Sequence, residues 1–478
     1  MPPSASLSPA AIAMNRFGLG ARPDDTLPAD PKGWLKEQFV RFQPATAAFA
    51  ALPDAGELVR TYLDEQRQLR RQASREQMAS PVAAGTKSIE QKAARRDYAQ
   101  DVQALYRQAV QARAQAALDT PAPFVERLVH FWSNHFCVSA DNPQVTAFAG
   151  AFERDAIRPH VLGRFEDMLL AVEHHPAMLI YLNQIQSIGP DSLAAQRAAR
   201  RNPEQRRGLN ENLGREIMEL HTLGVRSGYG QGDVTEFARA LTGWSVAGIG
   251  PGGATDGRPG DFLFRPQLHE PGARTILGKR YGEDGEAQAR AALIDFARAP
   301  ATVTHVATKL ARHFAGDAPP PALVERLAAS FQRSGGALPA LYRALIDSPE
   351  PWQPRPLKFK TPWEWTISAL RGLGRSEIGA MQVAAIQNQL GQPVWKPGSP
   401  AGWDDIAASW AGPDALLRRV DFAQRLVAPV GDRLDARQLG PRLLPASFSR
   451  ATAEEVGRAE SPGDALALLL VSPDFLRR

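Results

Sequence analysis

Residues 209–224, with the sequence LNENLGREIMELHTLG, are the part of the chain that decides the predicted fold. Apolar side chains recur there at three- and four-residue spacing, which is the period of an α-helix with one buried face. The residues on that buried stripe are Leu209, Leu213, Ile217 and Leu220. Gly224 is suited to the left-handed conformation that ends many helices. We therefore predict an amphipathic helix that packs on a core and stops at Gly224.

Two carboxylates of this predicted helix are the first candidates for chemistry. Glu216 lies about 60° from the centre of the stripe, so we expect it to be half-buried and paired, with Glu219 one step further out. A carboxylate at the edge of a core has the kind of environment that shifts a pKa for acid–base work. A structural ion-pair network produces the same pattern. Both readings of Glu216 and Glu219, catalytic and structural, are open at this point.

Other polar residues of the same stretch are candidates for binding. Glu211 and Arg215 are four residues apart and are predicted to form a surface ion pair. Arg215 and Asn210 are also candidate ligand-binding residues. His221 falls near the opposite edge of the stripe, where it is either a binding residue or a cation at the end of the helix.

A second predicted helix covers residues 124–136 and carries two more candidates. Phe124, Leu128, Phe131 and His135 fall on one stripe, so the imidazole of His135 points toward the core, while Asn134 lies on another face. A buried imidazole needs a hydrogen-bond partner, and both a core histidine and a functional one satisfy that need. We predict His135 as a catalytic residue and Asn134 as a binding residue. We further expect His135 and Glu216 to face one cavity.

The rest of the chain predicts a mainly α, multi-helical globular body with long irregular loops and little β structure. Proline and glycine separate the helical segments, and β-branched residues are few. We predict three segments: an N-terminal helical arm (1–118), a central helical core with the polar motifs (119–350) and a C-terminal helical lobe rich in tryptophan (351–478). The tryptophans of that lobe are expected in packing, with some lining a ligand cleft.

Two stretches, 185–208 and 246–261, are predicted to be long loops, which in compact proteins are often lids or binding loops. The first is rich in arginine and the second in glycine and proline. His269 follows the second loop and is a candidate binding residue that the loop delivers to a site. A simple turn histidine is the alternative. A Gly-x-Gly-x-x-Gly match at 248–253 lies inside this loop with no helix after it, so it predicts no dinucleotide site.

Composition excludes several classes of function. The net charge of +5 is dispersed over 478 residues, so nucleic-acid binding is not expected. Cys137 is the one cysteine, which excludes an intrachain disulfide and cysteine-rich metal sites, and its apolar surroundings favour an inert thiol over a nucleophile. No metal-binding motif is present, so no cofactor or metal is expected. Neither a membrane span nor a signal peptide is visible, so the expected location is cytoplasmic.

Several motifs, in this order, resemble a known bacterial family, the one catalogued as domain of unknown function 1800 (DUF 1800). They are Asn15 to Gly20, Phe131 to Phe136, Asn210 to Asn212, Arg215-Glu216, Glu219 to Gly224, Ala240 to Trp244, Gly391 to Pro393, Pro400 to Trp403, and Ser472 to Phe475. The resemblance implies a helical body and a separately encoded sulfatase- or phosphatase-like partner protein with an export signal, so export to the periplasm with that partner is an alternative location. It implies no catalytic residues.

These observations leave two hypotheses for function. The first, preferred slightly, is a hydrolase-type enzyme in which Glu216 or Glu219 acts with His135 as acid and base. The second is a non-catalytic accessory or binding protein that acts with a partner, the polar cluster then being a buried structural network. A structure that shows whether these side chains converge in an open cavity distinguishes the two.

Overall fold

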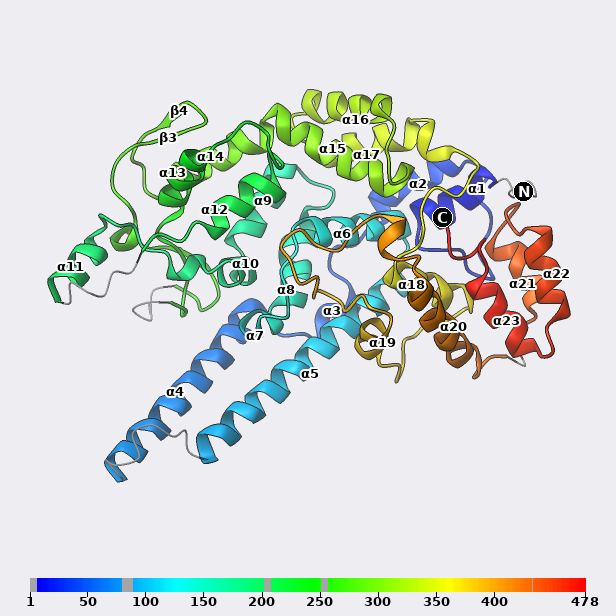
Figure 1. The fold of residues 1–478 in the computed structure, drawn as a ribbon, viewed down its shortest axis with the longest axis horizontal. Coiled ribbons are helices and arrows are strands. Elements are labelled where there is room, and N and C mark those ends of the chain that lie inside the picture. Colours follow the sequence, from blue (N-terminus) through cyan, green and yellow to red (C-terminus); the bar gives the residue numbers. More distant parts are fainter. Residues whose placement is uncertain (1–6, 80–88, 202–207, 251–256, 432) are drawn as a thin grey trace.

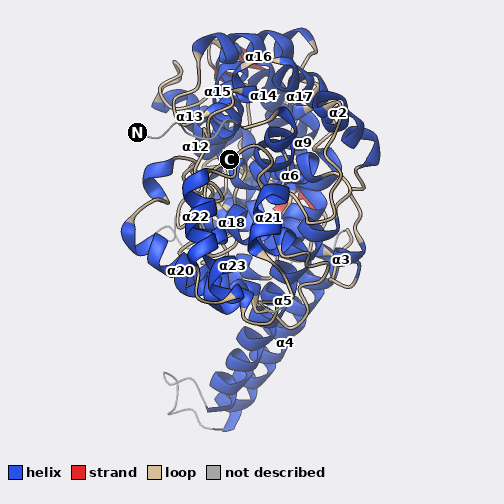
Figure 2. Cartoon of the chain, turned by 90° about the vertical axis from the view of Figure 1, so that its right-hand side faces the viewer, coloured by secondary structure: helices blue, strands red, loops and turns tan. Residues whose placement is uncertain are grey.

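The computed structural model describes residues 7–79, 89–201, 208–250, 257–431 and 433–478. Helices account for most of this part of the chain (Figure 2). Its strands are three residues long and form two antiparallel hairpins: β1 (Trp244–Val246) with β2 (Phe262–Phe264), and β3 (Arg274–Ile276) with β4 (Lys279–Tyr281). The prediction of a mainly α fold with little β structure is confirmed.

The first part of the chain, up to residue 119, begins inside the body, where Phe17 and Leu35 are fully buried, and only its two longest helices extend from the body as an arm (Figure 1). Its helices are α1 (Pro9–Ala11), α2 (Pro31–Arg41), α3 (Ala47–Ala50), α4 (Ala55–Ala79) and α5 (Ile89–Asp119). In Figures 1 and 2, α4 and α5 lie side by side and extend away from the remaining helices. The end of α5 is different, since Val110 and Ala114 are fully buried there. This end anchors the arm in the core.

The central helix is α6 (Pro123–His135), on which the rest of the core packs. Eleven of its thirteen residues are buried, so polar as well as apolar side chains face protein on all sides. The polar ones must therefore be paired. The carboxylate of Glu126 accepts hydrogen bonds from the two terminal guanidinium nitrogens of Arg158, at 2.7 and 2.9 Å. Arg127 donates to the carbonyl of Gly18 at 2.8 Å. The short helices that follow are α7 (Pro143–Thr146), α8 (Ala149–Phe152), α9 (Phe165–His174) and α10 (Pro176–Tyr181).

The decisive helix is shorter and wider than predicted. Regular α-helix covers only α12 (Asn212–Glu216), and a π-helical turn (Ile217–His221) continues it. A π-turn holds more residues than an α-turn, so side chains after Glu216 rotate away from the positions expected at 100° per residue. The element ends at His221, three residues earlier than predicted, and Gly224 has the predicted left-handed conformation, with φ +92° and its N–H donating to the carbonyl of Met218 at 3.1 Å. The next helix is α13 (Gln231–Leu241).

The prediction that residues 185–208 form one long loop is wrong. Residues 185–208 contain the helix α11 (Leu193–Arg201), whose sequence LAAQRAARR consists of strong helix formers. The hydroxyl of Ser192 accepts a hydrogen bond from the amide of Ala195 and so caps the first turn. Part of this prediction, at 202–207, falls outside the described residues. The other loop joins β1 to β2, and its residues 251–256 are likewise outside the described part.

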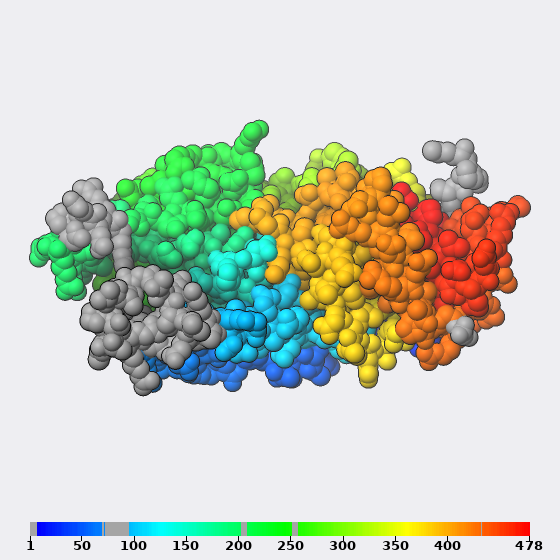
Figure 3. Space-filling view, turned by 60° about the horizontal axis from the view of Figure 1, so that its bottom comes forward, coloured from blue at the N-terminus to red at the C-terminus, as the bar shows by residue number. Residues whose placement is uncertain are grey.

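The remaining helices complete the body on both sides of α6. They are α14 (Glu286–Arg298), α15 (Pro300–Ala315), α16 (Pro321–Arg333), α17 (Leu338–Asp347), α18 (Pro362–Gly372), α19 (Val383–Gln389), α20 (Pro413–Val427), α21 (Ala436–Leu443), α22 (Arg450–Arg458) and α23 (Pro462–Val471). In Figure 3 the green segments and the orange to red segments occupy opposite ends, with cyan and blue segments between them. One continuous apolar cluster nevertheless runs from Ile12 to Leu476. The three-segment division stays a prediction.

Candidate functional site

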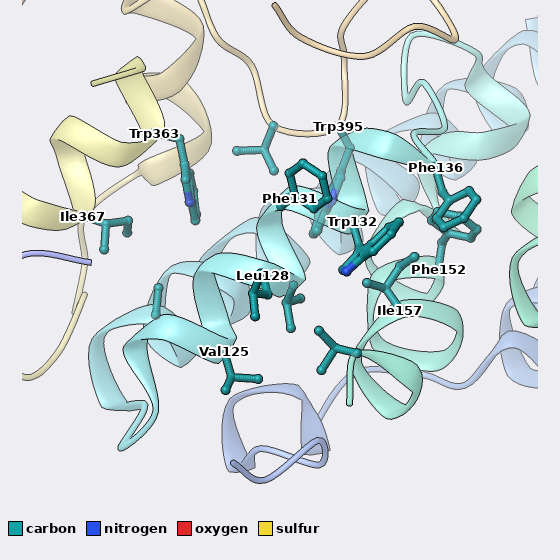
Figure 4. Packing of buried hydrophobic residues seen from close by; sticks show 14 of the residues in the cluster. Val125, Leu128, Phe131, Trp132, Phe136, Phe152, Ile157, Trp363, Ile367 and Trp395 are labelled. Atoms are coloured by element: carbon teal, nitrogen blue, oxygen red, sulfur yellow. The ribbon is translucent and has the colours of Figure 1, made fainter. Parts of the chain in front are cut away.

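A cavity of about 340 Å³ lies beside α6 and α15. Its wall is completed by the start of α18 and by residues 392–406. Aromatic side chains from three of these elements line it: Phe131, Trp363, Trp395 and Trp403. Figure 4 shows Trp363 and Trp395 reaching toward α6 near Phe131. Three of the tryptophans after residue 351 therefore line a cavity, and its use as a ligand cleft stays a prediction.

Asn134 fixes the segment that closes the cavity. Its amide nitrogen donates to the carbonyl of Trp403 at 2.9 Å, and its amide oxygen accepts from the backbone N–H of Trp403 at 2.7 Å. Gly402 allows this close approach, because a Cβ there would lie 2.4 Å from the Asn134 carbonyl oxygen and φ is +81°. Asn134 was predicted as a binding residue. It lines the cavity, and both ends of its amide are used to position Trp403.

The charged side of the cavity is one face of α15. His305, Lys309 and His313 follow one another at four-residue spacing, and Arg312 lies beside them. Lys309 and Arg312 both line the cavity. Burial is the largest effect on Lys309, and together with the nearby Arg312 guanidinium it lowers the pKa of the ammonium group to about 8. Neither Lys309 nor Arg312 forms an ion pair with a described residue.

The other cations of the wall are neutralised by carboxylates. Arg113 pairs with Glu153 at 2.8 Å and stacks 4.4 Å above the ring of Trp363. Arg127 pairs with Glu364, which Arg478 also contacts at 2.8 Å. Burial acts to raise the pKa of Glu364, but the two guanidinium groups outweigh it and hold that pKa well below its usual value. These pairs leave Lys309 and Arg312 as the cations of the wall without a counter-ion among the described residues.

His313 is held by a carboxylate at one ring nitrogen. Its Nδ1 lies 2.8 Å from Oδ2 of Asp405, and its Nε2 has no hydrogen-bond partner within the described chain. Burial, the largest effect, lowers the pKa of His313, so the imidazole is neutral at neutral pH. A neutral ring that donates from Nδ1 to a carboxylate leaves Nε2 free to accept a proton. Both His313 and Asp405 line the cavity.

Cys137 also lines the cavity, and it is unsuited to act as a nucleophile. Burial raises the pKa of its thiol to about 12. The sulfur lies 3.1 Å from the carbonyl oxygen of Pro400, to which the thiol donates. An inert thiol was the favoured reading, and the burial confirms it.

The two residues predicted to act as acid and base, His135 and Glu216, lie in different surroundings. His135 is 1% exposed, and its Nε2 lies 3.2 Å from the carbonyl oxygen of His221. Its inward direction is confirmed, and it lines the cavity. Glu216 is half-buried, as expected, and burial raises its pKa. The expectation that Glu216 is paired is wrong, because it has no hydrogen bond or ion pair with any described residue, and it is not part of the cavity wall. A shared His135–Glu216 site stays a prediction without a contact to support it.

His221 lies deeper than the predicted position at the edge of the stripe. Its side chain is fully buried, and Nδ1 lies 2.8 Å from Oε1 of Glu173, a buried carboxylate of α9. The π-turn explains the difference, because it rotates His221 toward the core. His269 is also buried, and its Nδ1 lies 2.8 Å from the carbonyl oxygen of Thr242. Both histidines are therefore engaged with protein groups.

The remaining candidates lie on the surface of the α12 region. Arg215 pairs with Glu211 at 3.0 Å, which confirms the predicted ion pair. Asn210 accepts a hydrogen bond from the amide of Asn212 through its side-chain oxygen. Glu219 is partly exposed and outside the cavity wall. Their roles in binding or catalysis stay predictions.

The residues that the sequence analysis missed are those of α15 and its partner loop: Lys309, Arg312, His313 and Asp405. One pattern in the sequence was available, namely three titratable residues at four-residue spacing, His305, Lys309 and His313. On an amphipathic helix this spacing puts all three on one face. No such pattern indicates Asp405, which reaches His313 from 92 residues away.

Comparison with protein-family profiles identifies the family of this chain. The profile described as "Protein of unknown function (DUF1800)" matches residues 12–477, so the chain belongs to this family. Comparisons with curated proteins and with solved structures gave no match. Within the described residues, no three His, Cys, Asp or Glu side chains are grouped so that they could hold a metal ion. No helix of that part of the chain is long and apolar enough to cross a membrane.

Proposed function

We propose that this protein binds a small anionic ligand in the cavity beside α6 and α15. The observation that carries the proposal is Lys309, a cation in the cavity wall with no carboxylate partner among the described residues. Removing a charge from water is costly unless an opposite charge or hydrogen bonds replace the lost hydration. A carboxylate, phosphate or sulfate group in the cavity would supply that partner.

The distribution of charge supports an anion rather than a cation. Glu364 is already shared by two arginines, and Asp405 is contacted by His313 and Lys358. The one remaining carboxylate of the wall, Asp404, is exposed and accepts a hydrogen bond from Ser409. A cationic ligand would thus find no buried carboxylate free to receive it, whereas an anion finds Lys309 and Arg312.

Thermal unfolding in the presence of sulfate tests the proposal. A ligand that binds only the folded state raises the unfolding midpoint as its concentration increases. We expect sulfate to raise the midpoint of the natural chain at constant ionic strength, and Lys309→Met to abolish most of that rise. Lys279→Met is the matched control, since this lysine on β4 has a 60% exposed side chain and lies outside the wall. An equal rise in both variants would refute the proposal.

Hydrolase-type acid–base chemistry is the second candidate, and the His313–Asp405 pair favours it. The pair presents a neutral imidazole whose Nε2 is unpartnered in the described chain, in the same wall as the two cations. General-base catalysis of this kind contributes about 10²–10⁴ in rate. Chromogenic esters of phosphoric, sulfuric and carboxylic acids provide the assay. His313→Gln should lower any activity by about 10² or more, and unchanged turnover would exclude His313 as the base.

The family resemblance adds a proposed partner, a separately encoded sulfatase- or phosphatase-like protein. Co-expression of the two chains followed by size-exclusion chromatography tests it. Co-elution would support the accessory role, and separate elution at micromolar concentration would argue against a stable complex.

A further inference from the structure

Lys309 and Arg312 occupy neighbouring positions on one face of α15 and both line the cavity. We propose that Lys309 forms an imine with a small 2-oxo acid whose carboxylate is bound by Arg312. This inference rests on the anion-binding function proposed above and names its ligand class. In this proposal Lys309 acts as a nucleophile as well as a positively charged group.

The surroundings of Lys309 favour a reactive amine. The neutral form of an amine is the nucleophile, and a lysine becomes one when it is desolvated or lies beside another cation. Both conditions hold here, since Lys309 is in a cavity wall and Arg312 is near it. The pKa of about 8 leaves about a tenth of the amine neutral at pH 7. Asp405 acts in the opposite direction, but His313 and Lys358 already contact its carboxylate.

The spacing of the two side chains fits a 2-oxo acid. Residues three apart on a helix have Cβ atoms about 5–6 Å from each other. In a 2-oxo acid the carbonyl carbon is bonded directly to the carboxylate carbon. The amine can therefore reach the carbonyl while the guanidinium receives the carboxylate in its planar fork. Arg312 has the capacity for this contact, because its Nε bonds only a carbonyl, that of Asp317, and it forms no ion pair with a described residue.

The covalent step needs no further reactant. The neutral nitrogen of Lys309 attacks the carbonyl carbon, the C=O π bond breaks, and one proton passes from the nitrogen to the oxygen to give a neutral carbinolamine. The second proton then passes from the nitrogen to the hydroxyl group, which departs as water while the nitrogen lone pair forms the C=N bond. His313 is placed four residues after Lys309, and its Nε2 can hold the proton between these steps. Phe131, Trp363 and Trp395 supply apolar surface in the wall beside this amine.

Reductive trapping of the full chain tests the inference. The protein is incubated with pyruvate and cyanoborohydride, which reduces an imine to a stable secondary amine, and the modified lysines are identified by peptide mass spectrometry. We expect Lys309 to be labelled at least tenfold faster than the exposed Lys279. Arg312→Gln should reduce labelling by pyruvate several-fold more than it reduces labelling by acetaldehyde, which has no carboxylate and reports only the change in the amine. Lys279→Arg is the control variant, with labelling of Lys309 unaltered.

If Lys309 is labelled no faster than Lys279, imine formation at Lys309 is overturned. This comparison is made within the natural chain and needs no variant. Equal effects of Arg312→Gln on pyruvate and acetaldehyde would overturn the assignment of the carboxylate. The sulfate titration separates these results from failure of the proposed function. Sulfate binding without selective labelling leaves an anion site with an unreactive lysine, whereas absence of sulfate binding removes the anion site itself.

Discussion

Asp405 joins a histidine of the cavity wall to a buried lysine outside that wall: Oδ2 lies 2.8 Å from Nδ1 of His313, and Oδ1 lies 3.1 Å from Nζ of Lys358. Burial acts to raise the pKa of Asp405, but His313 and Lys358 outweigh it and lower that pKa to about 2. The segment after Trp403 is thereby tied to α15. The carboxylate therefore determines both the position of the closing segment and the tautomer of His313.

Asp405→Asn is expected to destabilise the fold. Removing one partner of a fully buried ion pair costs about 3–5 kcal/mol, and we expect about 2 kcal/mol here because the side chain is 26% exposed. A carboxylate with a lowered pKa stabilises the folded state above its unfolded value of about 3.9, and this stabilisation is lost as the pH falls toward 2. Urea unfolding at pH 7 measures the difference. Asp404→Asn is the control, and its exposed side chain should change the free energy of unfolding by less than about 0.5 kcal/mol.

Glu216→Gln is expected to stabilise the protein slightly at neutral and alkaline pH. Burial raises the pKa of Glu216, and no described residue pairs with it, so its ionised form is disfavoured in the folded state. The group is partly exposed, and we therefore expect a gain of only about a few tenths of a kcal/mol. A raised carboxyl pKa costs stability as the pH rises through it, so the gain should be present at pH 8 and absent at pH 4.

Glu211→Gln on the same element is the matched control for that substitution. Hydrogen bonds from Thr235 and Gln231, together with Arg215, lower the pKa of Glu211. Its removal should decrease the unfolding midpoint at pH 8, opposite in sign to Glu216→Gln. A decrease for both variants would show that Glu216 has a favourable partner.

Periodicity predicted the elements well and the site in part. The inward direction of His135 followed from helical spacing, because one face of its helix packs on the core. The left-handed conformation of Gly224, beyond the helix end at His221, followed from the residue type. The π-turn after Glu216 did not follow from the sequence, since a single wide turn leaves the spacing of apolar residues almost unchanged. That turn is what moved His221 from the predicted edge of the helix into contact with Glu173.

The cavity itself depended on contacts between distant segments. Asn134 contacts Trp403, and His313 contacts Asp405, although the residues of each pair are far apart in the sequence. Sequence periodicity assigns a face to each residue but does not state which faces meet. The position of Glu216 at the edge of a core made its carboxylate a candidate functional group from the sequence. Lys309 became a candidate only when the structure showed how α15 packs against α6.

Acid should destabilise the protein through buried neutral histidines. Burial lowers the pKa of His174 to about 4 and that of His305 to about 4. Between pH 6.5 and 4 the unfolded chain takes up protons that the folded chain does not. Each such histidine then lowers the free energy of unfolding by about 1.4 kcal/mol per pH unit. Stability is complete above pH 6.5 and falls as the pH decreases.

His174→Phe isolates one of these groups. His174 stacks on Phe262 with ring centroids 3.8 Å apart, and its Nε2 has no partner in the described residues, so phenylalanine retains the packing. Urea unfolding at several pH values should show a smaller loss of stability for this variant between pH 6.5 and 4.5. Parallel curves for the variant and the natural chain would contradict the buried neutral form.

The pH dependence of labelling at Lys309 is the sharpest test of the amine. Its pKa of about 8 predicts that the rate of reductive trapping by acetaldehyde rises with a midpoint near pH 8, whereas an ordinary lysine amine has a midpoint near about 10.4. Burial has the largest effect on this pKa and lowers it; Cys137 and Asp405 raise it, and Arg312 lowers it. Arg312→Gln should therefore move the midpoint upward. Acetaldehyde is the reagent of choice because Arg312 does not bind it, so the shift reports the amine alone. A midpoint above pH 10 in the natural chain would show that Lys309 is solvated and fully charged at neutral pH.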